Sequence, residues 1–408
     1  MLGPLRSRDY RLFWSGSLIA NLGVWMQTTA LGWLVYDMTR KASLLGTISF
    51  AGNMPVLVLG LVGGAIADRA SRRVIMLSTL SVISATALAL ALLTGTGHIA
   101  VWHVIVISMV AGAANALFGP AMQAVIPSIV GPAELLNAIS LNSVQFNLAR
   151  TVGPALAGLA YGPLGPAGCF ALNAAGFLVM VLMIARVRMP RHQTISAPPV
   201  WRALRDALAY ARNHAVIGPA LLLATVMSVF GFPYIILLPA LARDGLGLGA
   251  SGLGYLLASV GAGAVVGGLA LSAAGNVARK DLAAMLSALA FGVTLAAFAI
   301  VRSPHGTGAL LFLMGVLQTV CVASINTTIQ IAVHDGMRGR VMSMMTVILF
   351  GFVTVGALLV GLVSDRIGVA AALAIGGVVI AVVATLLLAR VSALARIVEA
   401  GRSSATGT

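Results

Sequence analysis

The most constraining feature of this chain is a series of apolar stretches, separated by short breaks rich in Gly, Pro and charged residues. About 20 apolar residues in a helix cross the roughly 30 Å hydrocarbon core of a bilayer. With 60% hydrophobic and 9% charged residues, the chain lacks the polar groups needed to cover a water-soluble fold. We therefore predict an all-α membrane protein. Its twelve transmembrane helices are expected at 12–36, 43–66, 74–94, 101–122, 137–160, 168–187, 216–240, 250–274, 282–301, 307–329, 341–364 and 369–390.

The net charge of +15 indicates topology and not nucleic-acid binding, because clustered Lys and Arg on a polar background are missing. Short cytoplasmic loops carry an excess of Lys and Arg. Of the 25 Lys and Arg residues, 19 fall on the side of the N-terminus and Arg150 alone lies within a span. The five in the opposite loops are Arg40, Lys41, Arg243, Arg302 and Arg366. Both termini are thus expected in the cytoplasm, with a chain that crosses the membrane many times.

The two halves of the chain repeat each other, as expected of a transporter built from duplicated bundles. A shift of 208 residues places Ser43 on Ser251, and a shift of 203 places Gly153 on Gly356. We predict two pseudo-symmetric six-helix bundles joined by a linker that contains an interfacial helix. The expected units are an N-terminal bundle at 1–187, the linker at 188–215, a C-terminal bundle at 216–390 and a cytoplasmic tail at 391–408.

Arg150 lies about twelve residues into the fifth span, roughly 18 Å deep at a rise of about 1.5 Å per residue. A cation there costs on the order of 3 kcal/mol, so it should face the bundle interior and have partners. Ser143 and Asn147 share its helix face. We interpret this stripe as the wall of a cavity in which Arg150 contacts an anionic or carbonyl group. The alternative is a structural Arg bound by helix carbonyls or Gln side chains.

Further pathway candidates are polar and aromatic residues of the first, fourth, seventh and tenth spans. Each alone is equally consistent with helix packing, and as a set they predict cavity contact. They are Asn21, Trp25, Thr28, Asn115, Phe118, Phe230, Tyr234, Gln318 and Asn326.

The ten acidic residues all map to loops or span ends, so no carboxylate is available in mid-membrane to carry a coupling proton. Proton coupling would have to involve Asp68, Asp37 or an anionic substrate.

An enzyme needs a convergent nucleophile, base or metal cluster. The sequence has no His, Cys and Asp set at such spacing, so we expect no enzymatic activity, no metal and no cofactor.

The turn after the second span, from Gly64 to Arg73, resembles the loop signature of the major facilitator superfamily, with Ile66 in place of Leu and Ser71 in place of Gly. The resemblance implies a cytoplasmic gate, in which a carboxylate docks on a neighbouring helix start near Arg340 and Val341. Positive-inside anchoring is the alternative, and it explains the Arg residues but not the Asp or the glycine. The implied gate residues are Gly64, Asp68, Arg69, Arg72, Arg73 and Arg340.

Gly153, Pro154 and Gly158 resemble the helix 5 element of exporters in this superfamily, although Ala157 replaces one glycine. General helix packing by Gly and Pro is the alternative.

Within the superfamily, the chain resembles the transmembrane secretion effector branch, which includes the enterobactin exporter. The resemblance rests on residues 8–14, 137–143, 149–154 and 338–343, and Val24 stands where members often have Asp. It implies the major facilitator fold and a secondary transporter.

We therefore expect export of an amphipathic small molecule, such as a siderophore or drug, by alternating access. Import, or lipid or lysolipid flipping, is the alternative within the same fold. A receptor or structural role would instead predict tolerance of locked gates. The expected partners are the solute and the bilayer, with no nucleic acid and a functional monomer.

Overall fold

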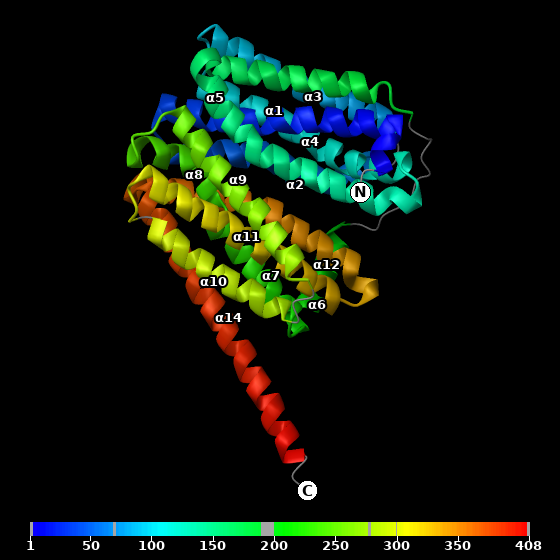
Figure 1. Ribbon diagram of the computed structural model, residues 1–408, viewed down its shortest axis with the longest axis vertical. Coiled ribbons are helices and arrows are strands. Elements are labelled where there is room, and N and C mark those ends of the chain that lie inside the picture. Colours follow the sequence, from blue (N-terminus) through cyan, green and yellow to red (C-terminus); the bar gives the residue numbers. More distant parts are fainter. Residues whose placement is uncertain (1–2, 68–70, 189–199, 276–278, 299, 406–408) are drawn as a thin grey trace.

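The computed structural model describes residues 3–67, 71–188, 200–275, 279–298 and 300–405, which form helices and no strand (Figure 1). Eleven helical segments of this described part are long and apolar enough to cross a membrane. The helices before the central linker are η1 (Gly3–Arg6), α1 (Arg8–Thr39), α2 (Ala42–Ala67), α3 (Arg72–Gly95), α4 (Val101–Ile129), η2 (Pro132–Glu134) and α5 (Leu135–Ile184). Those from the linker onward are α6 (Val200–Asn213), α7 (Ile217–Val226), η3 (Met227–Gly231), α8 (Pro233–Ala240), η4 (Leu241–Gly245), α9 (Ala250–Ala273), α10 (Lys280–Phe298), α11 (Pro304–Ala332), α12 (Asp335–Val347), η5 (Ile348–Phe352), α13 (Val353–Ile367) and α14 (Val369–Ala405).

The first half of α5 runs beside α1 in the same direction. The hydroxyl of Tyr10 donates a hydrogen bond to the carbonyl oxygen of Ala138 at 2.9 Å. One turn further along both helices, the indole nitrogen of Trp14 donates to the carbonyl oxygen of Leu141 at 3.1 Å. Rising numbers on α1 therefore meet rising numbers on α5.

The second half of α5 runs back along α1. Gly16 packs on Met180, whereas Gly23 packs on Asn173, so the order is reversed. The turn is made at Gly165, whose φ of 64° is accessible to glycine at little steric cost. Helix α5 thus contains two crossings, and the eleven apolar segments make twelve spans, consistent with the predicted number.

Two other crossings are interrupted by π-helical segments, a feature often found at functional sites. Segment η3 separates α7 from α8, and η5 separates α12 from α13. The two lie against each other. Just beyond η5, a Cβ added to Gly356 would lie only 2.2 Å from the carbonyl oxygen of Val229. These interruptions place Phe230 in η3 and Tyr234 one turn beyond it.

Several boundaries predicted from sequence were wrong. The helix predicted at 101–122 is longer than expected, because it continues through Pro120 and Pro127 to Ile129. The helix expected from 341 begins at Asp335, where the side chain of His334 caps it by accepting a hydrogen bond from the backbone nitrogen of Gly336 at 3.2 Å. The last helix extends to Ala405, so it continues from the span predicted at 369–390 into the segment at 391–408 that was predicted as a cytoplasmic tail.

The helices form two packed groups, which we call the N-terminal group (α1–α5) and the C-terminal group (α7–α14). In Figure 1 the first occupies the upper part and the second the lower part. The largest fully buried side chains include Tyr10 and Phe170 in the first group and Tyr234 and Phe291 in the second. Since lipid is as apolar as the helices, close packing and hydrogen bonds hold such groups together more than the hydrophobic effect does.

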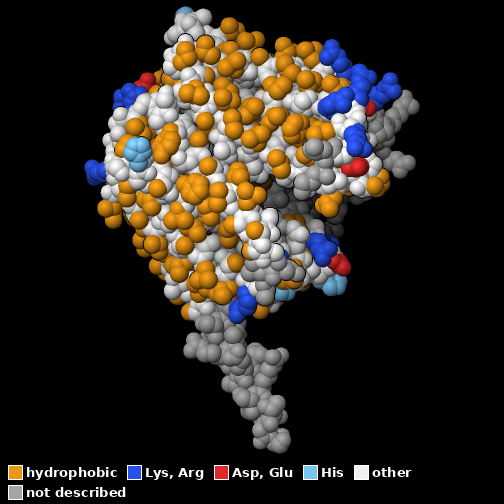
Figure 2. All heavy atoms as spheres, in the orientation of Figure 1, with side chains coloured by type: hydrophobic (Ala, Val, Ile, Leu, Met, Phe, Trp, Pro, Cys, Tyr) orange, Lys and Arg blue, Asp and Glu red, His pale blue; other side chains and the backbone are white. Residues whose placement is uncertain are grey.

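The broad outer surface is apolar, whereas charged side chains gather at its ends (Figure 2). Large exposed apolar side chains include Trp102, Leu159, Leu269 and Leu386. We call the end where α1 begins the terminal face and the end where α1 stops the distal face. At the terminal face, α6 packs on α12 and buries Ala207 and Ala211.

Candidate translocation pathway

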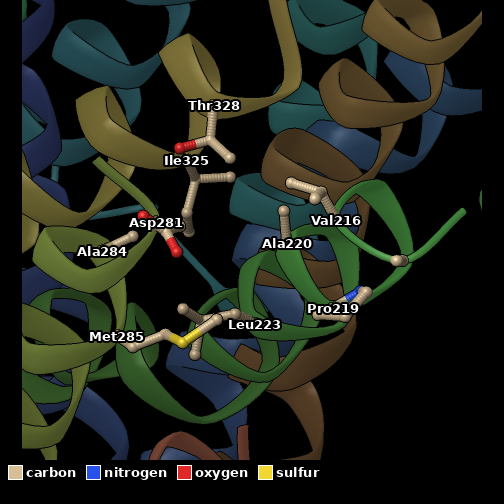
Figure 3. A pocket seen from close by; sticks show the side chains of 10 residues that line it. Val216, Pro219, Ala220, Leu223, Asp281, Ala284, Met285, Ile325 and Thr328 are labelled. Atoms are coloured by element: carbon tan, nitrogen blue, oxygen red, sulfur yellow. The ribbon is translucent and has the colours of Figure 1, made fainter. Parts of the chain in front are cut away.

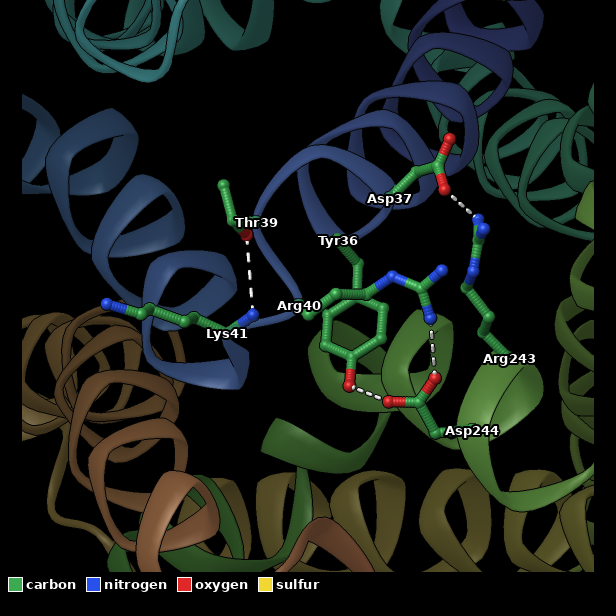
Figure 4. A network of polar contacts seen from close by, with 7 residues as sticks. All are labelled: Tyr36, Asp37, Thr39, Arg40, Lys41, Arg243 and Asp244. Atoms are coloured by element: carbon green, nitrogen blue, oxygen red, sulfur yellow. Dashed lines mark hydrogen bonds and ion pairs between the residues drawn. The ribbon is translucent and has the colours of Figure 1, made fainter.

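Two crossed ion pairs join the groups at the distal face (Figure 4). Asp37 of α1 pairs with Arg243 of η4, while Asp244 of η4 pairs with Arg40 beyond α1 at 3.0 Å. The hydroxyl of Tyr36 also donates to Asp244. The side chains of Arg40 and Asp244 are about half exposed, at 53% and 49%, so this pair contributes under about 1 kcal/mol.

A carboxylate closes a second distal contact, between α13 and α2. Oδ1 of Asp365 accepts hydrogen bonds from the backbone nitrogens of Ala42 at 2.8 Å and Ser43 at 3.2 Å. Beneath them, Gly46 lies so close to α13 that an added Cβ would be 2.3 Å from the carbonyl oxygen of Ala357. We call this contact the α2–α13 seam.

A matching contact, the α5–α9 seam, uses the predicted helix 5 element. Ser251 Oγ donates to the carbonyl oxygen of Gly158 at 2.8 Å. A Cβ on Gly254 would lie 2.7 Å from the carbonyl oxygen of Pro154. Gly153 instead faces its own group, where an added Cβ would lie 2.5 Å from Cβ of Trp25. Two members of the element thus lie between the groups and one lies within the N-terminal group.

Beneath the distal contacts, a cavity of about 250 Å³ lies between α1, α2, α4, α8 and α9. Trp25 and Thr28, both predicted pathway residues, line it together with Ser49, Ile235 and Leu257. On the terminal side, Figure 2 shows a notch in the surface between the two groups. The arrangement is closed distally and hollowed toward the terminal face.

Arg150 meets the C-terminal group. Its guanidinium lies near the phenol of Tyr234 across the boundary between the groups. The Tyr234 hydroxyl donates to Oε1 of Gln318 at 3.1 Å. Nη2 of Arg150 is buried and has no hydrogen-bond partner among the described residues. Three residues predicted independently thus lie near one another, and one buried donor of Arg150 has no acceptor within the described part of the chain.

The remaining predicted pathway residues are spread over both groups. Thr28, Asn115 and Ser143 are exposed and donate to carbonyl oxygens one turn earlier in their own helices, which leaves their oxygen atoms as acceptors. The half-buried ones are Asn21, Trp25, Phe118, Asn147, Phe230 and Asn326.

The predicted gate motif is described in part. Asp68 and Arg69 lie outside the described residues, and Gly64 lies in the last turns of α2. Arg72 and Arg73 begin α3, and Arg73 donates to the carbonyl oxygen of Ala185 within its own group.

Arg340 lies in the second turn of α12, so the expectation that it marks the helix start was wrong. It pairs with Asp206 of α6 at 2.9 Å, which ties the linker helix to the C-terminal group.

Sequence reasoning missed two features. Asp37 was named only as a candidate for proton coupling, and Asp244 and Asp365 were given no role, although all three sit at span ends near cations, which was a usable signal for ion pairs. Gln145 on α5 is fully buried, and neither its amide nitrogen nor its oxygen has a hydrogen-bond partner among the described residues. Nothing in the sequence distinguishes it from other polar residues of this helix.

A separate pocket of about 150 Å³ lies inside the C-terminal group, between α7, α10 and α11 (Figure 3). Leu223, Met285 and Ile325 line it, with Asp281 at its edge. Asp281 is paired with Arg279 at 3.2 Å. This pocket contains no predicted pathway residue and lies away from both seams.

Sequence relatives of the chain are transporters. The staphyloferrin A transporter of Staphylococcus aureus is 23% identical over 384 residues, covering 90% of this chain and 92% of the relative. Macrolide efflux protein A of Streptococcus pyogenes is 24% identical and covers 87% of this chain and 89% of the relative. The multidrug efflux pump Tap of Mycolicibacterium fortuitum is 25% identical, with 86% and 88% covered.

Solved transporter structures share the fold. The crystal structure of the nucleoside transporter NupG matches with a TM-score of 0.74 at 15% identity, covering 93% of this chain and 98% of that one. A POT family transporter in complex with 5-aminolevulinic acid matches with a TM-score of 0.71 at 12% identity, with 94% and 96% covered. A family model described as transmembrane secretion effector matches residues 1–405, and the chain therefore belongs to this family of major facilitator-type transporters.

Proposed function

We propose that this protein exports an amphipathic, anionic or carbonyl-rich small molecule by alternating access, as a transporter and not as an enzyme. In this proposal residues 1–187 and 216–390 rock against each other as two bundles joined by the linker at 188–215. The terminal face lies in the cytoplasm of a bacterial cell, with both chain ends, and the distal face lies outside. The distally closed arrangement is then the state that loads solute from inside.

The observation that carries the proposal is Nη2 of Arg150, which is buried near Tyr234 where the groups meet and has no acceptor among the residues that the structure describes. A buried cation without a full set of acceptors is costly, so it persists where a ligand supplies one. An anionic or carbonyl oxygen of the solute fits this position. The apolar wall of Ile235 and Leu257, with the Trp25 ring, suits the non-polar part of the same molecule.

The names of the sequence relatives suggest which solutes to test first. Their names include a siderophore transporter and macrolide and multidrug efflux proteins. Staphyloferrin A and a macrolide are therefore the first two probes.

The test compares flux in right-side-out and inverted membrane vesicles, since export loads inverted vesicles. Arg150→Ala should reduce flux by about 10- to 100-fold, because a hydrogen bond to a charged group contributes about 1.5–3 kcal/mol. Arg11→Ala is the control, since Arg11 is exposed at the terminal face and its guanidinium donates to the nearby carbonyl oxygen of Leu5. Accumulation in right-side-out vesicles would contradict the direction. Equal flux by Arg150→Ala would contradict the binding role.

A further inference from the structure

We propose that Asp365 is a gating residue, which holds the distal face closed by capping helix α2 from the opposite group and must release it in every transport cycle. The inference rests on the proposed function in one respect, namely that the distal face opens. It assigns a role in the cycle to one carboxylate at the α2–α13 seam.

The geometry is that of a helix cap supplied from another part of the chain. The first backbone N–H groups of a helix have no partner within that helix. In α2 those of Ala42 and Ser43 both donate to Oδ1 of Asp365. The residue that would normally cap α2 is Lys41, whose side chain has no acceptor atom. Helix α2 therefore depends on the C-terminal group for its cap.

The charges make this dependence stronger. A helix N-terminus is partially positive and disfavours nearby cations. Yet Arg40 and Lys41 stand directly before α2. Asp365 lies in the last turn of α13, the partially negative end of its own helix, which is equally unfavourable. Docking Asp365 on α2 relieves both mismatches together.

The cap exists only while the seam is closed. Next to it, a Cβ on Gly361 would lie 2.9 Å from the carbonyl oxygen of Ala42, so the two helix ends are in direct backbone contact. Around the cap, a distal vestibule of about 710 Å³ is lined by Arg40, Lys41 and Arg302. When the helices part, water replaces both hydrogen bonds and the cations again face an uncapped helix end. A contact made in one state alone biases the equilibrium between the two states.

The test measures distal opening directly and needs no solute. A Ser49→Cys reporter sits in the cavity beneath the seam, in a background in which Cys169 and Cys321 are replaced by Ala. A membrane-impermeant maleimide is applied from the side opposite the N-terminus, and the labelling rate is recorded. Asp365→Ala should raise this rate by about tenfold, since losing a helix cap and its charge shifts an equilibrium by that order.

The matched control is Asp335→Ala. Asp335 is likewise an exposed carboxylate at a helix end, the first turn of α12, but it pairs with Arg338 of the same helix at 2.9 Å. Its removal should leave labelling of Ser49→Cys unchanged. If Asp365→Ala keeps its thermal stability and labels no faster than this control, the gating role is wrong. If the protein failed to transport the tested solutes, the proposed function would be contradicted, but the conclusion about Asp365 would stand, because the labelling rate measures distal opening directly.

A second variant tests the capping itself. Lys41→Ser places a capping hydroxyl on α2's own chain, so the open state keeps its cap and labelling should rise with Asp365 still present. In that background Asp365→Ala should add less than twofold. Lys41→Gln, which removes the charge and supplies a poor cap, should preserve most of the Asp365→Ala effect. Full additivity of Lys41→Ser and Asp365→Ala would overturn capping across the groups.

Discussion

The α5–α9 seam gives a prediction that can be worked out from backbone distances. In Gly254→Ala the new Cβ would lie 2.7 Å from the carbonyl oxygen of Pro154 and 2.9 Å from Cα of Gly158. Both neighbours are backbone atoms, so relief requires the helices to separate. Overpacking costs about 1–3 kcal/mol, and here the cost falls on the distally closed state alone. The ratio of open to closed molecules should therefore rise by about 5- to 150-fold.

The assay is a distance measurement between spin labels on the two groups. His98→Cys and His305→Cys place labels on exposed residues after α3 and at the start of α11, both at the distal face. Pulsed electron resonance then reports the populations with short and long separations. Gly254→Ala should transfer population from the short to the long distance.

Two glycines of the same helix are the controls. Gly268→Ala meets nothing within 4 Å and should behave as the parent. Gly263→Ala would place its Cβ 1.9 Å from the carbonyl oxygen of Phe312, a contact within the C-terminal group, and should lower thermal stability without changing the distal distance. The reasoning is refuted if Gly254→Ala matches Gly268→Ala, or if Gly263→Ala opens the distal face equally.

Two further predictions concern polar contacts. Asp37→Asn removes the ion pair with Arg243 and should increase distal opening by at most about fivefold. This effect should vanish in about 1 M salt, where the Debye length is near 3 Å, and an effect that persists there would contradict a surface electrostatic origin. Tyr234→Phe removes the donor to Gln318 Oε1 in a fully buried position and should destabilise the protein by about 1–3 kcal/mol in detergent unfolding. A loss below about 0.5 kcal/mol would mean that another donor reaches Gln318.

The number of spans was predictable because bilayer thickness dictates the length of each apolar stretch. The reversal at Gly165 was predictable as well, since the spans predicted at 137–160 and 168–187 leave a loop there. The π-helical segments η3 and η5 inside spans were not, because they depend on how two distant helices pack.

The candidate site shows the same division between local and long-range information. Arg150 was found because a single cation inside an apolar span is costly in itself. Tyr234 and Gln318 were found as isolated polar residues, and their joining with Arg150 depends on the packing of α5 against the C-terminal group. The pairing of Asp365 with the start of α2 spans more than 300 residues, and the sequence alone contains no signal for that pairing.

The two distal seams are equivalent in the repeat and differ in chemistry. Both bring glycines to within van der Waals contact of an opposing backbone, as Gly46 and Gly254 do. The α5–α9 seam adds a neutral hydrogen bond from Ser251, whereas the α2–α13 seam adds the ionised cap of Asp365. A neutral contact responds weakly to salt, while an exposed charge beside a helix end is screened. Shape therefore sets how closely both seams close, and charge adds to the hold of the α2–α13 seam alone, so salt should weaken that seam more than the α5–α9 seam.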